Sequence, residues 1–344
     1  MKIAELCSVL RKVDPRSSHG IYNHVANLCG SLSSKGHAVS LFAAGDAEVK
    51  NKVYSRAAIH GLARGLTEDE IMRENLETAS YCFGNAEKFD IIHSHFSLIG
   101  CHFSPLVKTP TFHSIHSPIS AALKPHLLQY KKEKFISFSL AQRKQLPQLN
   151  WVANIYHGID TSIYTFNETP EEYVLYIGRI TSEKGVHHAI AAAKEAGVTL
   201  LIAGVSYPNE SYWSQYIEPH INGVTVRFLG QAGMEQKIAL MQKAKALLFP
   251  TQYDEVFGLV MIEAMACGTP VIGFDVGSVG EVIQDGETGF VVKTTKQMAS
   301  AIKKIGNISR HATRKRAEAF FSIERMTLGY ERVFRRYLPK EENA

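Results

Sequence analysis

The sequence predicts an α/β protein built from two Rossmann-like domains, each with a parallel sheet covered by helices. Two observations lead to this prediction. Short apolar runs alternate with helix-like segments along the chain, as they do in consecutive βα units. The length of 344 residues exceeds the usual size of one domain and suits two domains of roughly 150–180 residues.

The composition is that of an ordinary globular protein, with 45% hydrophobic and 21% charged residues. A net charge of +5 is too modest to predict a nucleic-acid partner, although the basic clusters are compatible with weak association with a membrane surface. No apolar run approaches the ~20 residues of a membrane span, and the start of the chain lacks a signal-peptide pattern. Five scattered cysteines without metal-ligand spacing indicate reduced thiols, so we expect a cytoplasmic protein.

The first βαβ unit opens the chain. A strand over residues 3–6 leads through a polar loop to a helix near Gly20. This helix carries Val25 and Leu28 on one apolar face, and a second strand follows over residues 38–44. The order strand, helix, strand predicts two parallel neighbours in one sheet.

Two further strands of the first domain end in histidines. Alternation along residues 90–95 puts His93 and His95 on the same side of one strand. The pair is compatible with a metal site, but no acid or cysteine stands at a suggestive spacing, so we expect hydrogen-bonded core histidines and no metal. The strand over residues 109–116 ends at His116, where open parallel sheets bind ligands. The alternative for His116 is a buried or helix-capping histidine.

The second domain begins with a buried strand over residues 173–178, after a polar stretch. Arg179 and Lys184 follow that strand and precede a helix that starts at about Gly185. Two cations beside a helix start make a good diphosphate site, because arginine offers a forked donor and lysine a point charge. The alternative is a pair of solvated charges on a loop.

Residues 246–270 combine a buried strand, an acidic loop and a helix. Glu255 falls on the loop, and the helix opens near Gly258, which lets the backbone come close to an anionic ligand. Glu263 lies inside the helix among apolar neighbours, where a carboxylate needs hydrogen bonds that sugar or ribose hydroxyls would supply. The alternative has Glu255 on the surface and Glu263 satisfied by nearby protein groups.

This stretch resembles the retaining glycosyltransferases of family 4, which have the GT-B fold. The likeness rests on Glu255 and Glu263 with Phe257-Gly258 between them, followed by the pattern E-A-x-A-x-G-x-P-V. Residues 178–185 match the family's G-R-x-x-x-x-K-G, and the matching segments run in the right order over most of the chain. The resemblance implies two Rossmann-like domains that face each other across a cleft.

The resemblance and the shifts in composition set the expected domain boundaries. We expect an acceptor domain over residues 1–160, a linker over 161–172 and a nucleotide-sugar donor domain over 173–325. Residues 326–344 are expected to form a helix that packs back on the first domain.

Site residues follow from the resemblance, position by position. The implied catalytic residues are His116, Glu255, Arg179 and Lys184, and the implied donor-binding residues are Gly20, Phe228, Gly230, Phe257, Gly258, Leu259 and Glu263. In these roles Glu255 contacts the hydroxyls of the sugar, Glu263 the ribose, and His116 lies on the side of the donor sugar. One departure is His19, which stands where the family usually has a glycine and puts the contacts of that loop in question.

The resemblance implies transfer of a hexose from a nucleotide sugar to an acceptor hydroxyl with retention of the anomeric configuration. Residues 41–46 and 155–160 resemble a bacterial UDP-glucose-dependent subgroup, so UDP-glucose is the first candidate donor and GDP-mannose the second. The cations would stabilise the departing diphosphate, so no metal or other cofactor is expected.

Several properties cannot be read from the sequence. The acceptor could be a small molecule, a glycan or a lipid-linked glycan, because variable loops build its site. The oligomeric state is equally open. Two other functions remain as alternatives: an NDP-sugar 2-epimerase-like isomerase with the same fold, and a catalytically inactive module that binds nucleotide sugars.

Overall fold

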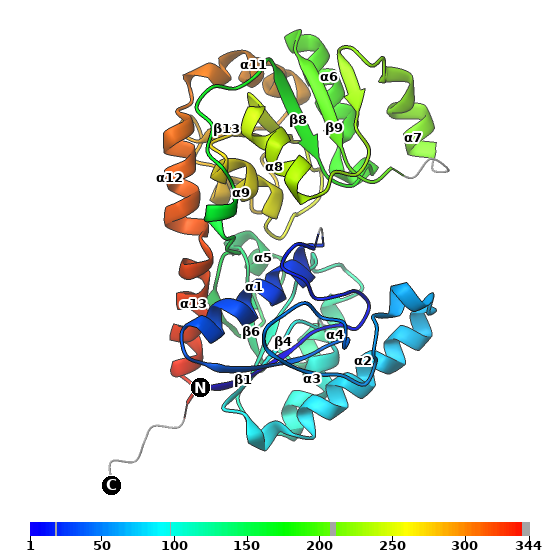
Figure 1. Cartoon of the computed structure of the whole chain (residues 1–344), viewed down its shortest axis with the longest axis vertical. Helices are drawn as coiled ribbons and strands as arrows, with labels where there is room; N and C mark the ends of the chain where they lie inside the picture. Colours follow the sequence, from blue (N-terminus) through cyan, green and yellow to red (C-terminus); the bar gives the residue numbers. More distant parts are fainter. Residues whose placement is uncertain (18, 97, 207–210, 339–344) are drawn as a thin grey trace. The chain divides into compact units, whose positions relative to one another are not determined.

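The computed structural model describes residues 1–17, 19–96, 98–206 and 211–338. The chain divides into two compact units (Figure 1). The first unit combines Met1–Gly158 with Ile323–Ala344, of which residues 339–344 lie outside the described part. The second unit is Ile159–Ser322. It includes residues 161–172, which the sequence suggested as a linker.

The described residues of the first unit form a seven-stranded sheet in the order β3-β2-β1-β4-β5-β6-β7. All of its neighbouring strands pair in parallel. The strands are β1 (Lys2–Leu6), β2 (Ala38–Phe42), β3 (Lys52–Tyr54), β4 (Ile91–Ser94), β5 (Thr111–Ser114), β6 (Lys134–Ser137) and β7 (Trp151–Asn154). The strand order reverses between β1 and β4, and such a switch point opens a crevice at the carboxyl ends of the strands.

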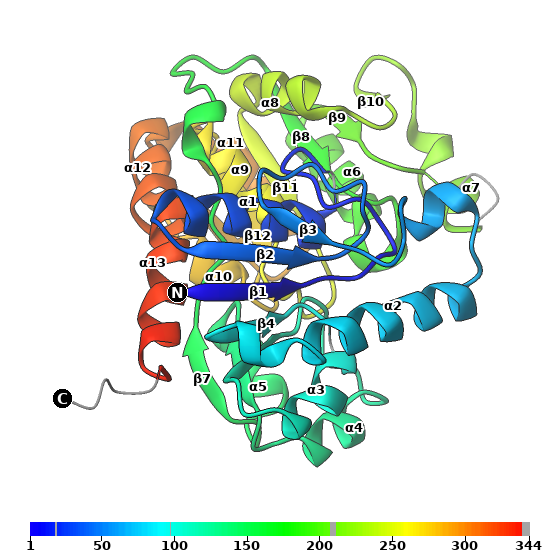
Figure 2. The same cartoon turned by 60° about the horizontal axis from the view of Figure 1, so that its bottom comes forward.

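The helices of the first unit connect and flank these strands (Figure 2). They are α1 (Gly20–Ser34), α2 (Glu68–Phe83), α3 (Ile99–Phe103), α4 (Lys124–Gln129), α5 (Leu140–Gln145) and α13 (Ile323–Arg335), with short 3-10 turns at Gly61–Arg64, Ala86–Lys88 and Ser104–Leu106. Alternate residues of β1 reach two separate core clusters. Ile3 packs with residues of α1 and α13, whereas Ala4 and Leu6 pack with residues of α2. The sheet is therefore buried on both faces, as a parallel sheet requires.

Helix α13 supplies a large part of the first core, although it comes from the end of the chain. Tyr330 and Phe334 are fully buried there, together with Met326 and Val333. The spacing of these side chains at three, four and seven residues is that of an amphipathic helix. Tyr330 also lies with its hydroxyl 3.3 Å from His24 Nε2, so α13 reaches the histidines described below.

The second unit repeats the architecture with six described strands in the order β10-β9-β8-β11-β12-β13, again all parallel. The strands are β8 (Tyr173–Ile177), β9 (Thr199–Ala203), β10 (Val226–Phe228), β11 (Ala246–Phe249), β12 (Val271–Phe274) and β13 (Gly289–Val292). The helices are α6 (Val186–Ala196), α7 (Ser211–Tyr216), α8 (Met234–Lys243), α9 (Leu259–Ala266), α10 (Val279–Val282), α11 (Thr295–Lys304) and α12 (Arg310–Phe321), with 3-10 turns at Thr161–Ile163, Ser182–Lys184, Glu218–His220 and Ile305–Asn307. The order reverses between β8 and β11.

Arg310, at the start of α12, ties several segments of the second unit together. It is 8% exposed, and its guanidinium donates to the backbone carbonyls of Asn167, Gln242 and Ala244 and to Thr269 Oγ1, at 2.6–2.9 Å. These partners come from residues 161–172, from the end of α8 and from the turn after α9. One buried cation therefore holds three chain segments against α12.

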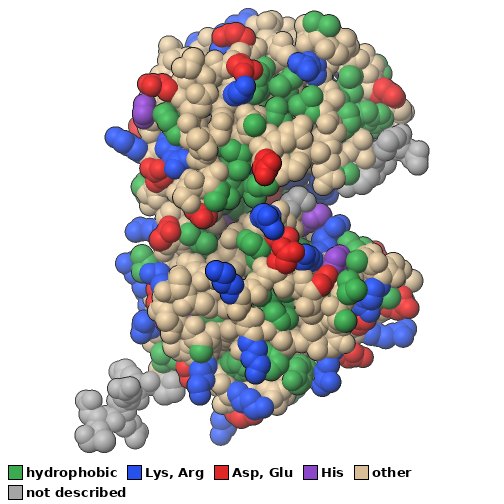
Figure 3. Space-filling model, viewed as in Figure 1, with side chains coloured by type: hydrophobic (Ala, Val, Ile, Leu, Met, Phe, Trp, Pro, Cys, Tyr) green, Lys and Arg blue, Asp and Glu red, His purple; other side chains and the backbone are tan. Residues whose placement is uncertain are grey.

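On the face seen in Figure 3, acidic and basic side chains are interspersed with apolar ones over each unit. Within the described ranges, no helix combines the length and the apolar character needed to cross a membrane.

Candidate functional site

The switch point of the second unit brings together two predicted site residues that lie far apart in sequence. Lys184 follows β8 and Glu255 follows β11, and these two strands are neighbours in the sheet. Lys184 Nζ donates to Glu255 Oε2, and the hydroxyl of Tyr253 donates to the same oxygen at 2.6 Å. The Lys184 and Glu255 side chains are 16% and 15% exposed. The ammonium also lies 4.8 Å from the ring centroid of Tyr253, a cation–π contact.

The position of Lys184 depends on the glycine that follows it. Gly185 has a φ of +70° and forms the start of α6. A Cβ atom built on it would lie 2.0 Å from the carbonyl oxygen of Pro250, which follows β11. Only glycine combines this left-handed backbone with such a close approach. The β8 and β11 loops can therefore meet closely enough for the pair between Lys184 and Glu255 to form.

Arg179, the other predicted cation, directly follows Gly178 at the end of β8. Its Nη2 donates to Glu183 Oε1 at 3.0 Å, and both side chains are about half exposed. An exposed pair of this kind contributes little to stability, since measured values are typically about 0.2–1 kcal/mol. The guanidinium can therefore exchange Glu183 for an anionic ligand at small cost.

The start of α9 presents backbone rather than side-chain groups. Gly258 precedes the helix with a φ of +80°, and no side chain caps the first turn. Phe257 is 1% exposed, its ring packs against Phe321, and its carbonyl accepts a hydrogen bond from Ser278 Oγ at 2.8 Å. Leu259 is half-buried in the first turn. The amide groups of this first turn can bind an anion.

Protein groups donate hydrogen bonds to one oxygen of Glu263, as the alternative reading of the sequence allowed. Glu263 lies inside α9 and is 8% exposed. Its Oε1 accepts a hydrogen bond from Lys237 Nζ at 2.7 Å and one from the hydroxyl of Tyr164 at 3.1 Å. Protein groups thus supply hydrogen bonds to one oxygen, and the carboxylate keeps acceptor capacity at its second oxygen.

Phe228 and Gly230 lie at the carboxyl end of β10, which is an edge strand. Phe228 is half-buried and packs edge-on against Trp213 at 4.9 Å between ring centroids. Gly230 has a φ of +73°, and among the described residues a Cβ atom there would meet nothing within 4 Å apart from its own chain neighbours. The described residues therefore leave space on the Cβ side of Gly230.

In the first unit, His19 and Gly20 mark the start of α1. His19 is the N-terminal cap, with an extended φ of −98°, and its carbonyl accepts from Tyr22 N and Asn23 N. Gly20 is the first residue of α1, and its φ is not positive. A histidine therefore fits at position 19 without backbone strain.

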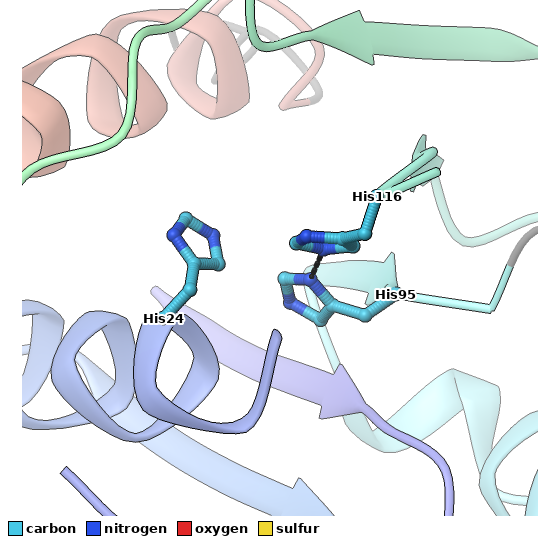
Figure 4. A group of neighbouring side chains, drawn as sticks. All are labelled: His24, His95 and His116. Atoms are coloured by element: carbon cyan, nitrogen blue, oxygen red, sulfur yellow. Dashed lines mark hydrogen bonds between the residues drawn. The ribbon is translucent and has the colours of Figure 1, made fainter. Parts of the chain in front are cut away.

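The predicted site residue His116 belongs to a cluster of histidines at the switch point of the first unit. His95, just after β4, lies with its Nδ1 2.8 Å from His116 Nε2, as the dashed line in Figure 4 shows. His24 approaches the same two rings from α1 (Figure 4), and its Nδ1 lies 2.8 Å from His157 Nδ1. The ring centroids of His24 and His116 are 5.3 Å apart.

Glu5, the fourth residue of β1, is an acid that the sequence analysis did not connect with the histidines. Its side chain is fully buried, and its Oε2 lies 2.8 Å from His95 Nε2 and 2.9 Å from His93 Nδ1. His93 Nε2 pairs in turn with Ser114 Oγ at 2.8 Å. His93 and His95 are thus hydrogen-bonded core histidines on the same side of the sheet, as predicted. A lone glutamate inside an otherwise apolar strand was the available signal for Glu5.

Two groups in this cluster have the composition of a metal site: His24, His95 and His116, and Glu5, His93 and His95. Ligand nitrogens of a tetrahedral zinc ion with ~2.05 Å bonds lie about 3.3 Å apart. His95 Nδ1 and His116 Nε2 are 2.8 Å apart, which is a hydrogen-bond distance. The structure therefore shows a hydrogen-bonded pair at this position, and a metal would have to separate the two rings.

Burial keeps these imidazoles neutral. Desolvation lowers the pKa of His93 to about 3 and that of His157 to about 3. Desolvation, assisted by the neighbouring His93, lowers the pKa of His95 to about 4. The pKa values of His24 and His116 are also lowered well below their usual value by burial. A neutral imidazole has one donor and one acceptor nitrogen, so each hydrogen bond in the cluster restricts the next.

We expect this cluster to make the first unit sensitive to acid. The unfolded chain binds protons at these histidines near pH 6.5, whereas the folded chain does so only near pH 3–4, so stability falls as pH decreases below 6.5. At pH 5 each of the three would cost up to about 2 kcal/mol. Urea unfolding at pH 7.5 and pH 5.0 measures the effect. Burial raises the pKa of Glu5, so this carboxyl favours the folded state as the pH falls. We expect the histidines to dominate, because they outnumber this single carboxyl. An unchanged urea midpoint would contradict the expectation.

A further hollow in the second unit was not predicted. It has a volume of about 650 Å³ and lies at the carboxyl ends of β12 and β13, where Asp275 and Lys293 face it. His188 also lines it and is held by Thr295 Oγ1 at 2.8 Å. These residues carry no recognisable spacing in the sequence, because the ends of β12 and β13 and the helix α6 bring them together.

Two family models match the chain. The model of "Glycosyl transferases group 1" matches residues 163–320, and that of "Glycosyltransferase Family 4" matches residues 18–163. Glycogen synthase of Mycobacterium tuberculosis is 36% identical over 152 residues, which cover 42% of this chain and 36% of that relative. The chain thus spans about a third of the length of this curated relative.

Solved structures resemble the chain over nearly its full length. Sucrose-phosphate synthase from Thermosynechococcus elongatus has a TM-score of 0.77 at 20% identity and covers 97% of this chain and 98% of its own. The Anabaena protein HepE, solved in complex with UDP and glucose, has a TM-score of 0.74 at 18% identity and covers 98% and 100%. At these identities the likeness is one of fold, and it confirms the predicted class: parallel sheets in two Rossmann-like units of a GT-B protein.

Proposed function

This chain belongs to the glycosyltransferases that those two family models describe, and we propose that it transfers a hexose from a UDP-sugar to an acceptor hydroxyl with retained anomeric configuration. The observation that carries the proposal is the contact between Lys184 and Glu255 at the switch point of the second unit. Open parallel sheets bind their ligands at such points. UDP with glucose, and UDP-glucose itself, occupy solved structures of HepE, which supports a UDP-sugar as donor and glucose as its first candidate.

In this proposal, the cations of the second unit bind the diphosphate. Arg179 exchanges its exposed partner Glu183 for phosphate oxygens, and Lys184 Nζ turns part of its donor capacity from Glu255 to the leaving group. The amides at the start of α9 add dipoles to the same anion. Charge that develops on the departing diphosphate is then stabilised by groups already in place. These groups supply the positive charge without a metal ion.

Two carboxylates recognise the donor. Glu255 accepts hydrogen bonds from sugar hydroxyls, and the bonds from Lys184 and Tyr253 hold its side chain in one orientation. Glu263 accepts from the ribose hydroxyls while Lys237 and Tyr164 hold its other oxygen. Neither carboxylate acts as a covalent nucleophile. Retention follows from attack on the same face of the sugar, with the leaving phosphate taking the proton of the acceptor.

The remaining predicted residues bind parts of the donor without charge. The open backbone at Gly230 and the ring of Phe228 contact the base, and the backbone from Phe257 to Leu259 contacts the sugar and the diphosphate. In the first unit, His116 donates to or accepts from a sugar hydroxyl, and Gly20 at the start of α1 adds a backbone contact to the diphosphate.

Nucleotide binding is the first test of the proposal. UDP at ~100 times its dissociation constant should stabilise the protein by about 2.7 kcal/mol, whereas GDP and ADP at the same concentration should not. A thermal-shift series with these nucleotides and with their glucose and mannose conjugates measures the difference. A shift with GDP-mannose alone would move the donor to the second candidate, and no shift with any nucleotide would remove the basis for the site.

Product analysis separates the proposed transfer from isomerisation. Incubation with UDP-N-acetylglucosamine should give no mannosamine product, whereas a 2-epimerase would form one. Turnover of the UDP-sugar by the parent and its loss in Glu255→Ala would exclude a catalytically inactive binding module.

A further inference from the structure

The histidine cluster contains a series of hydrogen bonds, here called the Glu5–His95–His116 relay, that begins at a buried carboxylate and ends at His116. Glu5 Oε2 pairs with His95 Nε2 at 2.8 Å, and His95 Nδ1 pairs with His116 Nε2 at 2.8 Å. Glu5 and His95 are buried, whereas His116 is half-buried on the loop after β5. These hydrogen bonds therefore connect a buried residue of β1 with a half-buried residue on the loop after β5, and Figure 4 shows the contact between His95 and His116.

We propose that Glu5 and His95 are positioning residues that fix the ring of His116 and determine which of its nitrogens carries hydrogen. This inference rests on the proposed function, in which His116 contacts the sugar. It gives a role to Glu5, and it gives His95, which the sequence placed among the core histidines, a role in orienting His116.

The order of donors and acceptors follows from the chemistry of imidazole. With Glu5 ionised, His95 must donate from Nε2, because a carboxylate only accepts. A neutral His95 then has a lone pair on Nδ1, which accepts a hydrogen bond from the Nε2–H of His116. His116 consequently presents an unprotonated Nδ1, which is an acceptor for a hydroxyl of the sugar. Without Glu5, either tautomer of His95 would be allowed and His116 would have no fixed tautomer.

Orientation is the second effect of the Glu5–His95–His116 relay. An imidazole on a loop can rotate about its side-chain bonds, and such a rotation would move the accepting Nδ1 away from the sugar hydroxyl. The hydrogen bond that His116 donates to His95, together with the ring of Phe138 at 4.5 Å between centroids, restricts this rotation. A displacement of about 1 Å at a reacting group can cost on the order of 100-fold in rate.

His93 provides a matched control inside the same cluster. It is fully buried, as His95 nearly is, and it lies 2.9 Å from the same oxygen of Glu5. Its other nitrogen pairs with Ser114 Oγ instead of His116. Replacing His93 with glutamine therefore disturbs the surroundings of Glu5 but leaves the hydrogen bonds from Glu5 through His95 to His116 in place. Replacing His95 with glutamine keeps an amide near the position of Nε2, facing Glu5, and removes the partner of His116.

The experiment compares His95→Gln with His93→Gln by two readouts. Nitrogen-15 NMR of histidine-labelled protein at pH 8 reports the tautomer of His116, and initial rates report sugar transfer. We expect one Nε2–H tautomer in the parent and in His93→Gln. In His95→Gln we expect mixed tautomers and a decrease in kcat/KM of about 10–100-fold. Glu5→Gln is nearly isosteric and gives a second test of the tautomer if His95→Gln unfolds.

The two readouts keep this inference separate from the proposed function. An unchanged His116 tautomer in both His95→Gln and Glu5→Gln would overturn the inference, whatever the rates. Mixed tautomers with an unchanged rate would support the control of the His116 tautomer by Glu5 and His95, and would contradict the role of His116 in transfer. Equal losses of rate in His93→Gln and His95→Gln would show a merely structural role and overturn the inference. One equivalent of a transition metal in the purified protein would also overturn it, since a metal would occupy His116 Nε2.

Discussion

Replacement of Lys184 with alanine is expected to lower kcat/KM for sugar transfer by about 10²–10³-fold, the effect typical of removing one preorganised group that stabilises developing negative charge. Lys184 lies at the carboxyl end of β8 and is directly bonded to Glu255, so its loss acts at two places. The leaving diphosphate loses a cation, and Glu255 keeps only the hydroxyl of Tyr253 to fix its orientation. Steady-state kinetics with UDP-glucose, or with whichever donor binds, measure the change.

The control for this experiment is Lys194→Ala. Lys194 lies in the last turn of α6, where its Nζ is 3.0 Å from His220 Nδ1 at the exposed surface. Lys194→Ala changes the net charge by the same amount as Lys184→Ala but leaves the switch point intact. Its kcat/KM should therefore stay within about threefold of the parent value. A Lys184→Ala variant that also stays within this range would contradict the assignment of Lys184 to the diphosphate. The variant Lys184→Arg keeps the charge and should recover part of the lost rate.

Replacement of Arg310 with alanine is expected to give the largest loss of stability, about 3–5 kcal/mol for unfolding of the second unit. Four acceptors from three separate segments lose their donor at once, and three of them are backbone carbonyls. A buried acceptor without a partner costs about 1–3 kcal/mol, and partial access of water reduces the sum. A decrease in melting temperature on the order of 10 °C should be seen by calorimetry.

Lys315→Ala is the matched control, since Lys315 is an exposed cation on the same helix. Its substitution should change stability by less than about 0.5 kcal/mol. If Arg310→Ala and Lys315→Ala had the same melting temperature, the network around Arg310 would be irrelevant to stability.

The sequence predicted the two parallel sheets and most positions at the strand ends because both follow from local patterns. Lys184 and Glu255 could each be placed at the carboxyl end of a strand. Their contact could not be predicted, because 71 residues separate them and the contact depends on which strands are neighbours. The adjacency of β8 and β11 is a property of the whole sheet.

Buried polar partners were the other part that local patterns missed. Glu5 stands in an apolar strand, and its meaning appeared only when β1 and β4 paired and brought His93 and His95 against it. Sugar or ribose hydroxyls were the first candidates for the hydrogen bonds of Glu263, but which protein groups would contribute was not predictable: Lys237 from α8 and Tyr164 donate to one of its oxygens. A side chain's own neighbours in sequence say that it is buried, but not which distant group will compensate its charge.

The origin of α13 has a consequence for the order in which the protein can fold during synthesis. The first unit needs Tyr330 and Phe334 to fill its core, and these residues follow the entire second unit in the chain. Residues 1–158 therefore leave the ribosome with an apolar face uncovered, and this face stays uncovered while residues 159–322 are synthesised. At about 5–20 residues per second, this exposure lasts on the order of ten seconds or more. The second unit, which is continuous in sequence, can fold first as it emerges, and the earlier part of the chain is the one that depends on chaperones.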